Sequence, residues 1–167
     1  SGAKIAKYMN IFYTLRAEKE DSSKKTDKKK QYISDMESEQ MNEFRPLILV
    51  AEDDDSNFKL IKAIIGKKCD IEWAKNGQEM VELFQQHQQR AKAMLMDIKM
   101  PVMNGLEATK IIRESNTEIP IIMQTAYAFS SDKENAMNAG ATEVLVKPIT
   151  LGILRTTLSK YLPDLQW

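Results

Sequence analysis

Hydrophobic and polar positions follow a regular order from Pro46 to the end of the chain. Short runs rich in apolar residues, the pattern of strands in a parallel sheet, alternate with longer segments whose apolar residues recur at helical spacing. The first helical segment reaches from Asp54 to Gly66, where the glycine acts as a stop signal. We predict five strands, each followed by a helix, at residues 47–51, 70–74, 93–97, 121–125 and 143–146.

Turn and capping signals mark where the helices begin and end. Asn76 and Asn104 each precede a glycine and predict a turn that leads into a helix. Ser131 and Glu134 have the spacing of a capping box, so we predict that the fourth helix begins at Ser131 and that Gly140 ends it. The alternating DIEWA strand should lie nearer a sheet edge than the others. Strict alternation of strands and helices implies right-handed crossovers and an α/β fold with helices on both faces of a parallel sheet.

The composition changes near residue 45, so we divide the chain into an N-terminal extension at 1–45, a domain at 46–163 and a tail at 164–167. Residues 18–38 are polar and predict a solvated linker or an exposed helix. Before them, apolar residues recur at helical spacing, although the run IFYTL fits a strand equally well. These few apolar side chains cannot form a core by themselves.

Charge and composition exclude several classes of protein. Lys plus Arg and Asp plus Glu both number 24, which argues against nonspecific binding to nucleic acid. The single cysteine, Cys69, excludes an internal disulfide framework, fits a reducing cytosol and is typical of a buried apolar position. No apolar run approaches the ~18 residues that span a bilayer, so we expect a cytoplasmic domain without membrane contact.

Chemically capable side chains collect where the predicted strands end. Glu52 and Asp53 follow the first strand, Asp97 ends the third, Thr125 ends the fourth and Lys147 follows the fifth. The carboxyl ends of parallel strands line the binding crevice of open α/β sheets, so these residues should converge. Three converging carboxylates repel one another, and a hard divalent cation such as Mg²⁺ or Mn²⁺ relieves this repulsion with oxygen ligands.

This set of residues predicts phosphoryl transfer to Asp97. Its carboxylate would be both a metal ligand and the nucleophile, while the cation neutralises charge on the phosphoryl group. Thr125 would donate a hydroxyl hydrogen bond to a phosphoryl oxygen, and Lys147 would supply a positive charge. Taken singly, Glu52 and Asp53 could be helix caps and Lys147 a surface lysine, but their joint order along the strands favours the site.

Four motifs, AEDD, MLMDIKMPVMNG, IIMQTA and VLVKPI, resemble those of two-component response-regulator receiver domains over residues 46–163. The resemblance implies a doubly wound, flavodoxin-like parallel sheet with strand order 2-1-3-4-5. It also implies that Asp97 is phosphorylated, that the backbone carbonyl of Lys99 binds the metal, and that the bond between Lys147 and Pro148 is cis. The chain would then accept a phosphoryl group from a histidine kinase or a histidine phosphotransfer domain, in a reaction that it catalyses itself.

The chain departs from this family's pattern at one position of the activation switch. Receivers often carry an aromatic residue three positions before the lysine, whereas this chain has Val144. Tyr127 could act with Thr125 in its place, or could equally be an exposed loop residue. We expect a small switch, with partner contact and a weak dimer through the face formed by residues 131–161. A phosphotransfer partner could instead contact the loops around Asp97.

Two other classes of function compete with the receiver. A phosphatase that forms an aspartyl phosphate usually carries a second acid two residues after the nucleophile, where this chain has Lys99. A flavin- or nucleotide-binding module is disfavoured, because the six glycines form neither a G-x-G-x-x-G nor a Walker loop.

Among receivers, two architectures remain open, a stand-alone regulator and the C-terminal receiver of a hybrid sensor histidine kinase. In the second case the full-length protein could be membrane-anchored. The linker, the KPI sequence and the start at Ser1-Gly2 without Met, which resembles the scar of tag removal, favour the hybrid.

Overall fold

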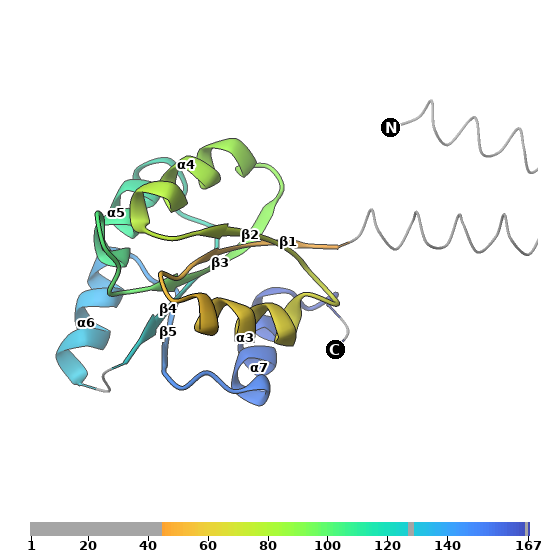
Figure 1. Cartoon of the computed structure of the whole chain (residues 1–167). Helices are drawn as coiled ribbons and strands as arrows, with labels where there is room; N and C mark the ends of the chain where they lie inside the picture. The colour runs from red at the N-terminus through yellow and green to blue at the C-terminus, as the bar shows by residue number, and fades with distance from the viewer. Residues whose placement is uncertain (1–44, 127–128, 166) are drawn as a thin grey trace, which may run out of the picture. The chain divides into compact units, whose positions relative to one another are not determined.

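The computed structural model describes residues 45–126, 129–165 and 167. In these residues, strands and helices alternate strictly, as the sequence predicts (Figure 1). The strands are β1 (Leu47–Ala51), β2 (Asp70–Ala74), β3 (Ala91–Asp97), β4 (Ile121–Thr125) and β5 (Glu143–Val146). The helices are α3 (Asp55–Ile65), α4 (Gly77–His87), α5 (Gly105–Ser115), α6 (Ser130–Ala139) and α7 (Leu151–Tyr161).

The strands form one parallel sheet in the order β2-β1-β3-β4-β5. This confirms the doubly wound, flavodoxin-like order and the edge position of β2. The order reverses between β1 and β3, and such a reversal opens a crevice at the carboxyl ends of the strands. Ala51 pairs with Met96 across these two strands, so Glu52 and Asp97 lie side by side at that crevice.

Helices cover both faces of the sheet, as predicted (Figure 1). On one face, residues of α4, α5 and α6 pack in a core that includes Phe84. On the other face, α3 and α7 pack in a second core that includes Phe58. Neighbouring residues of β1 alternate between these cores, with Leu49 in the first and Val50 in the second. Because both faces are buried, the strands carry the near-continuous apolar runs from which they were predicted.

Capping explains where the helices begin and end, with one correction. Asp54 caps α3, and its Oδ1 accepts hydrogen bonds from two first-turn amides at 2.8 Å each. The predicted capping box at Ser131 is wrong, because α6 begins at Ser130 and its N-cap, Phe129, makes no side-chain hydrogen bond. Ser131 therefore lies inside the first turn. Gly140 ends α6 with a left-handed φ of 105°, which a glycine adopts without strain.

The third strand is longer than predicted. It begins at Ala91 rather than at residue 93. Ala91 is buried, but the exposed Lys92 interrupts the apolar pattern. Because the polar Lys92 separates Ala91 from the apolar run that begins at Ala93, the start of the strand is not visible in the apolar pattern.

Arg45 ties the start of β1 to the loop after α3. Its guanidinium donates hydrogen bonds to the carbonyl oxygens of Gly66 and Cys69, both at 2.7 Å, and to Asp70 Oδ1 at 3.0 Å. The bond to Gly66 satisfies a main-chain oxygen at the carboxyl end of α3, which has no partner within the helix, and the bond to Cys69 holds the residue before β2. The compact unit of the structure that contains the sheet begins at this residue.

Two expectations concern residues outside the described part of the chain, the polar linker at 18–38 and the run IFYTL before it. Of the residues that the structure does describe, none belongs to a helix long and apolar enough to cross a membrane.

Candidate functional site

Three of the predicted site residues meet at the carboxyl end of the sheet. Lys147 Nζ lies 2.6 Å from Asp97 Oδ2 and 2.8 Å from Glu52 Oε2. Since β4 lies between β5 and β3, the lysine side chain extends past the end of β4 to make these bonds. The bond between Lys147 and Pro148 is cis, which confirms what the resemblance implied.

The charges of this group are largely removed from water. The side chain of Glu52 is 0% exposed, that of Asp97 10% and that of Lys147 18%. Burial lowers the pKa of Lys147, but its hydrogen bonds to Asp97 and Glu52 and their negative charges raise it by more, so this pKa lies above its ordinary value. The lysine is therefore charged at neutral pH. Two carboxylates share this one ammonium group, and the site can accept further positive charge.

Asp53 adds a third carboxylate. One oxygen each from Glu52, Asp53 and Asp97 lies within 4.8 Å of the others, and Asp53 is exposed whereas the other two residues are buried. An all-oxygen set that opens to solvent on one side suits Mg²⁺, because this ion binds through a few carboxylates and keeps several waters. The donor set therefore fits a magnesium ion.

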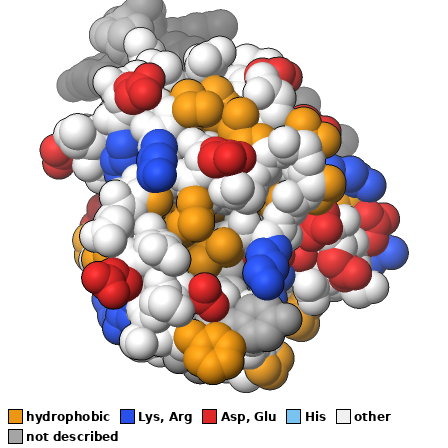
Figure 2. All heavy atoms as spheres, turned by 90° about the vertical axis from the view of Figure 1, so that its left-hand side faces the viewer, with side chains coloured by type: hydrophobic (Ala, Val, Ile, Leu, Met, Phe, Trp, Pro, Cys, Tyr) orange, Lys and Arg blue, Asp and Glu red, His pale blue; other side chains and the backbone are white. Residues whose placement is uncertain are grey.

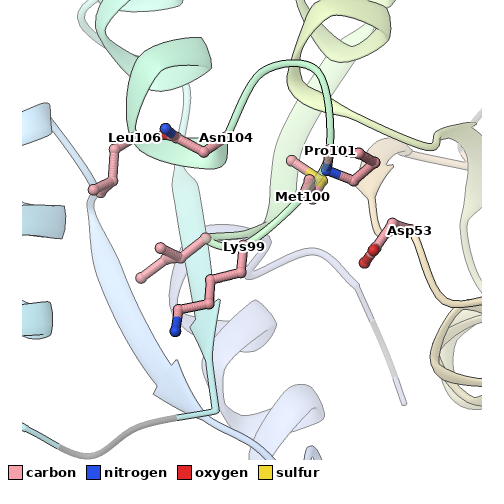
Figure 3. Close-up of a pocket in the computed structure, with 7 residues that line it drawn as sticks. Asp53, Lys99, Met100, Pro101, Asn104 and Leu106 are labelled. Carbon is pink, nitrogen blue, oxygen red and sulfur yellow. The ribbon is translucent and has the colours of Figure 1, made fainter.

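An open pocket of about 550 Å³ lies beside this acid cluster. Figure 3 shows Asp53, from the loop after β1, facing the loop that carries Met100 and Pro101. The main-chain N–H of Lys99 donates to Asp97 Oδ1 at 3.3 Å, so the chain after β3 turns closely around the Asp97 carboxylate. The pocket is lined by Asp53, Ile98, Lys99, Met100, Pro101, Asn104 and Leu106.

No signal in the sequence points to the residues that fix Glu52. The indole N–H of Trp73 donates to the main-chain oxygen of Glu52 at 2.8 Å, from 21 positions away in the chain. The side-chain amide of Asn57 donates to Glu52 Oε1 at 3.1 Å. Trp73 also stacks on Phe58, with ring centroids 4.0 Å apart and planes within 3° of parallel. Glu52 is thus held through both its main chain and its side chain.

Gly105, at the start of α5, packs against the main chain of Asp97. A Cβ atom at this position would lie 2.1 Å from the Asp97 carbonyl oxygen, so only glycine permits the approach. Asn104 and Glu107 form a capping box that starts the helix there. The Asn104-Gly105 turn therefore does more than begin a helix, because it also sets the position of Asp97.

The predicted switch residues are only partly described. Thr125 ends β4, is 4% exposed, and its carbonyl oxygen accepts a hydrogen bond from the amide of Lys147 at 2.8 Å. Val144 is partly buried and packs against the core on the side of α4, α5 and α6. Val146, which pairs with Thr125 in the register of β4 and β5, is 45% exposed. Tyr127 lies outside the described residues, and both of its predicted roles stay predictions.

The face at the carboxyl ends of the strands carries apolar and charged side chains together. Figure 2 shows apolar side chains grouped near the middle of this face, with acidic and basic side chains around them. Val102, in the loop after β3, is 85% exposed, and Phe129, before α6, is 66% exposed. Grouped apolar side chains on a protein surface are typical of an interaction site.

Comparisons with known proteins agree with this geometry. The family model described as the response regulator receiver domain matches residues 48–159. Hybrid signal transduction histidine kinase I of Dictyostelium discoideum is 36% identical over 129 residues, which cover 70% of this chain and 7% of the kinase. The chain thus spans a small part of the length of that relative.

Two solved structures extend the comparison. The receiver domain of sensor histidine kinase PA1611 from Pseudomonas aeruginosa, with a magnesium ion coordinated in its active-site cleft, is 31% identical with a TM-score of 0.65, covering 71% of this chain and 98% of that one. The receiver domain of Ssk1 from Saccharomyces cerevisiae, in complex with the histidine phosphotransfer protein Ypd1, is 28% identical with a TM-score of 0.65, covering 70% of this chain and 88% of that one.

Proposed function

Because this chain belongs to the family of response regulator receiver domains, which act in two-component phosphorelays, we propose that it accepts a phosphoryl group from a phosphohistidine onto Asp97 in a Mg²⁺-dependent reaction. The observation that carries this proposal is the ion-pair arrangement of Lys147, 2.6 Å from Asp97 and 2.8 Å from Glu52. This arrangement places the carboxylate of Asp97 beside a fixed positive charge. The same carboxylate belongs to the acid cluster that fits a metal ion.

In the proposed step, a carboxylate oxygen of Asp97 bonds to phosphorus as the bond from phosphorus to the donor's histidine nitrogen breaks. The nitrogen keeps the electron pair of that bond, and Asp97 becomes an acyl phosphate. Lys147, already charged and oriented, stabilises negative charge on the phosphoryl oxygens. The hydroxyl of Thr125, at the end of the neighbouring strand, donates a hydrogen bond to another of these oxygens.

Glu52, Asp53, Asp97 and the backbone carbonyl of Lys99 would hold the Mg²⁺ ion. When bound, the ion neutralises negative charge on the phosphoryl group and on the acid cluster. Mn²⁺ prefers the same oxygen ligands and should replace Mg²⁺. Glu52 is the most firmly held of these ligands, because it is buried and accepts hydrogen bonds from Trp73 and Asn57.

The proposed phosphodonor is a histidine kinase or a histidine phosphotransfer domain. Support comes from the yeast receiver of the same fold that was solved together with such a phosphotransfer protein. The apolar side chains grouped on this face offer a surface on which a donor could dock while its histidine reaches Asp97 (Figure 2). Val102, in the loop after β3, is 85% exposed and available for such contact.

We also propose that the receiver is part of a hybrid sensor histidine kinase whose receiver works in the cytoplasm. The Dictyostelium relative, a hybrid kinase in which the similar region is 7% of the length, supports this architecture. Mass spectrometry of the full-length gene product tests it. A product limited to a single receiver would instead favour the stand-alone regulator.

Phosphorylation by acetyl phosphate tests the function directly. With Mg²⁺ present, the protein should gain one acid-stable, base-labile phosphoryl group, and Asp97→Asn should abolish this labelling. Asp55→Asn is the matched control, because Asp55 is an exposed aspartate paired with Lys75 at 3.1 Å, and its loss should leave labelling unchanged. Normal labelling of the Asp97→Asn variant would overturn the proposal.

A further inference from the structure

Gln124 is a buried polar residue to which the proposed reaction gives no role. It lies in β4 directly before Thr125 and is 1% exposed. Among the residues that the structure describes, neither the oxygen nor the nitrogen of its side-chain amide has a hydrogen-bond partner. An unpaired buried amide destabilises a folded protein, so its presence calls for a physical reason.

Gln124 is the neighbour of Asp97 in the sheet. The register of β3 and β4 pairs Asp97 with Gln124, and it pairs Leu95 with Ile122 two residues earlier. Leu95 and Ile122 both pack in the core on the side of α3 and α7. Since side chains alternate along a strand, Asp97 and Gln124 point to this same side of the sheet.

The side chain of Lys147 passes the same place. Leu145, which pairs with Gln124 in the register of β4 and β5, packs in the same core. Lys147 follows two residues later, and its ammonium group reaches Asp97 and Glu52 on strands beyond β4. The lysine side chain therefore lies over the end of β4, on the side where Gln124 is buried.

We propose that Gln124 is a positioning residue for phosphoryl transfer, whose amide oxygen accepts a hydrogen bond from Lys147 when this lysine binds the phosphoryl group on Asp97. A lysine ammonium has three N–H donors, and in the unphosphorylated site two of them serve Asp97 and Glu52. Movement of the ammonium toward a phosphoryl oxygen turns its donors, and the amide oxygen of Gln124 is an acceptor on the strand that the lysine crosses. Phosphorylation then pairs an amide that the resting site leaves unpaired. The inference rests on the proposed function, since it requires a phosphoryl group on Asp97.

Beryllofluoride with Mg²⁺, a mimic of the phosphoryl group, tests this inference in the full chain. Gln124→Leu removes the amide and keeps a similar volume, and Gln124→Met serves as a second variant in case the first does not fold. Thr109→Val is the matched control. Thr109 is 0% exposed, its hydroxyl has no partner among the described residues, and it belongs to α5, which covers the opposite face of the sheet.

All three substitutions should raise the melting temperature of the unphosphorylated protein, because each removes an unpaired buried polar group. Only the Gln124 variants should bind beryllofluoride more weakly, by about tenfold, the effect of losing one hydrogen bond to a charged group. Their Mg²⁺ affinity without beryllofluoride should equal that of wild type. Wild-type beryllofluoride affinity in both Gln124 variants would overturn the inference. Absence of beryllofluoride binding by wild type would instead overturn the proposed function, and this inference with it.

Discussion

Trp73 donates its indole N–H to the main-chain oxygen of Glu52 at 2.8 Å, which links the edge strand β2 to the acid pair. The indole is itself fixed, since it stacks on Phe58 at 4.0 Å and Lys75 Nζ lies 4.7 Å from its ring centroid. From α3, the side-chain amide of Asn57 donates to Glu52 Oε1 at 3.1 Å. The segment that carries Glu52 and Asp53 is therefore held from β2 and from α3.

Trp73→Phe should weaken Mg²⁺ binding. Phenylalanine keeps the aromatic stack on Phe58 but loses the hydrogen bond to Glu52, which is worth about 1 kcal/mol, so we expect roughly two- to tenfold lower Mg²⁺ affinity in calorimetric titration. Trp167→Phe is the control, because Trp167 donates to Ser159 on α7 and does not contact the acid pair. This control leaves Trp73 as the single tryptophan, and its fluorescence should then report Mg²⁺ binding. Equal Mg²⁺ affinity in both variants would show that the indole does not position the acid pair.

Lys147→Met should destabilise the metal-free protein strongly. It leaves Glu52, with a side chain 0% exposed, and Asp97 without their shared cation, and an unpaired buried charge costs about 3–5 kcal/mol of unfolding free energy. Mg²⁺ should restore much of this loss, and it should bind the variant more tightly than wild type because no ammonium competes for the carboxylates. The measurement is thermal unfolding over a range of Mg²⁺ concentrations.

The control for this variant is Lys160→Met. Lys160 forms a surface pair with Glu143 at 2.7 Å and its side chain is 53% exposed, so its loss should cost less than about 1 kcal/mol. If Mg²⁺ does not change the melting temperature of the Lys147→Met protein, the proposed metal site is contradicted.

The strand ends could be predicted from the sequence because topology alone places them. A parallel sheet brings the carboxyl ends of its strands together, so the order of the strands alone predicts that Glu52, Asp97 and Lys147 converge. Contacts such as that between Trp73 and Glu52 could not be predicted, since they join side chains far apart in the chain and follow no periodic pattern. The capping-box rule also failed at one helix. Ser131 and Glu134 have the required spacing, but α6 begins at Ser130, so Ser131 lies inside the helix.

Arg45 should be needed for stability although it precedes the first strand. Deletion of residues 1–44 should leave a folded protein that still accepts phosphate, because both described core clusters and the acid cluster are formed by residues after 44. In this shortened protein, Arg45→Gln should lower the free energy of unfolding by about 2 kcal/mol, since hydrogen bonds from a charged group to Asp70 and to two carbonyl oxygens are lost.

Arg90→Gln is the control for this prediction. Arg90 also pairs with Asp70, but its side chain is 55% exposed, so the loss should stay below about 1 kcal/mol in urea unfolding. Failure of the 45–167 protein to fold would show that the N-terminal extension is an integral part of the domain.

Cys69 should be unreactive in the folded protein. Burial raises the pKa of its thiol from 9.0 to about 11, so the reactive thiolate is scarce at pH 8. An aromatic disulfide reagent at pH 8 should label Cys69 only after unfolding, and rapid labelling of the native protein would contradict the buried thiol.

The raised pKa of the Cys69 thiol also makes its contribution to stability depend on pH. Because the folded state holds the thiol proton more tightly than the unfolded state, this contribution to the free energy of unfolding is complete below about pH 9 and is lost as the pH rises toward 11. Cys69→Ala should lack this decline in stability at alkaline pH.

Val144 occupies the position at which many receivers carry a switch aromatic. It packs against the core on the side of α4, α5 and α6, and Val146 beside it leaves an exposed apolar surface next to Thr125. Helices α6 and α7 carry further exposed apolar side chains, which are Met137, Leu151 and Ile153. They agree with the partner contact and weak dimer expected through the face formed by residues 131–161.

The structural response to phosphorylation should therefore be small. A phosphoryl group draws Thr125 and Lys147 toward it, but Val144 has no ring to swing inward and carry this movement to α6 and α7. With beryllofluoride and Mg²⁺, amide chemical-shift changes should be confined to the surroundings of Asp97, Thr125 and Lys147. Val144→Tyr should extend them into α6, whereas Val144→Ile should not. Large changes throughout residues 126–161 of the wild type would contradict the weak switch. A phosphorelay needs only access to Asp97. The rate at which the receiver exchanges its phosphoryl group with a histidine phosphotransfer protein should therefore be similar in wild type and in Val144→Tyr.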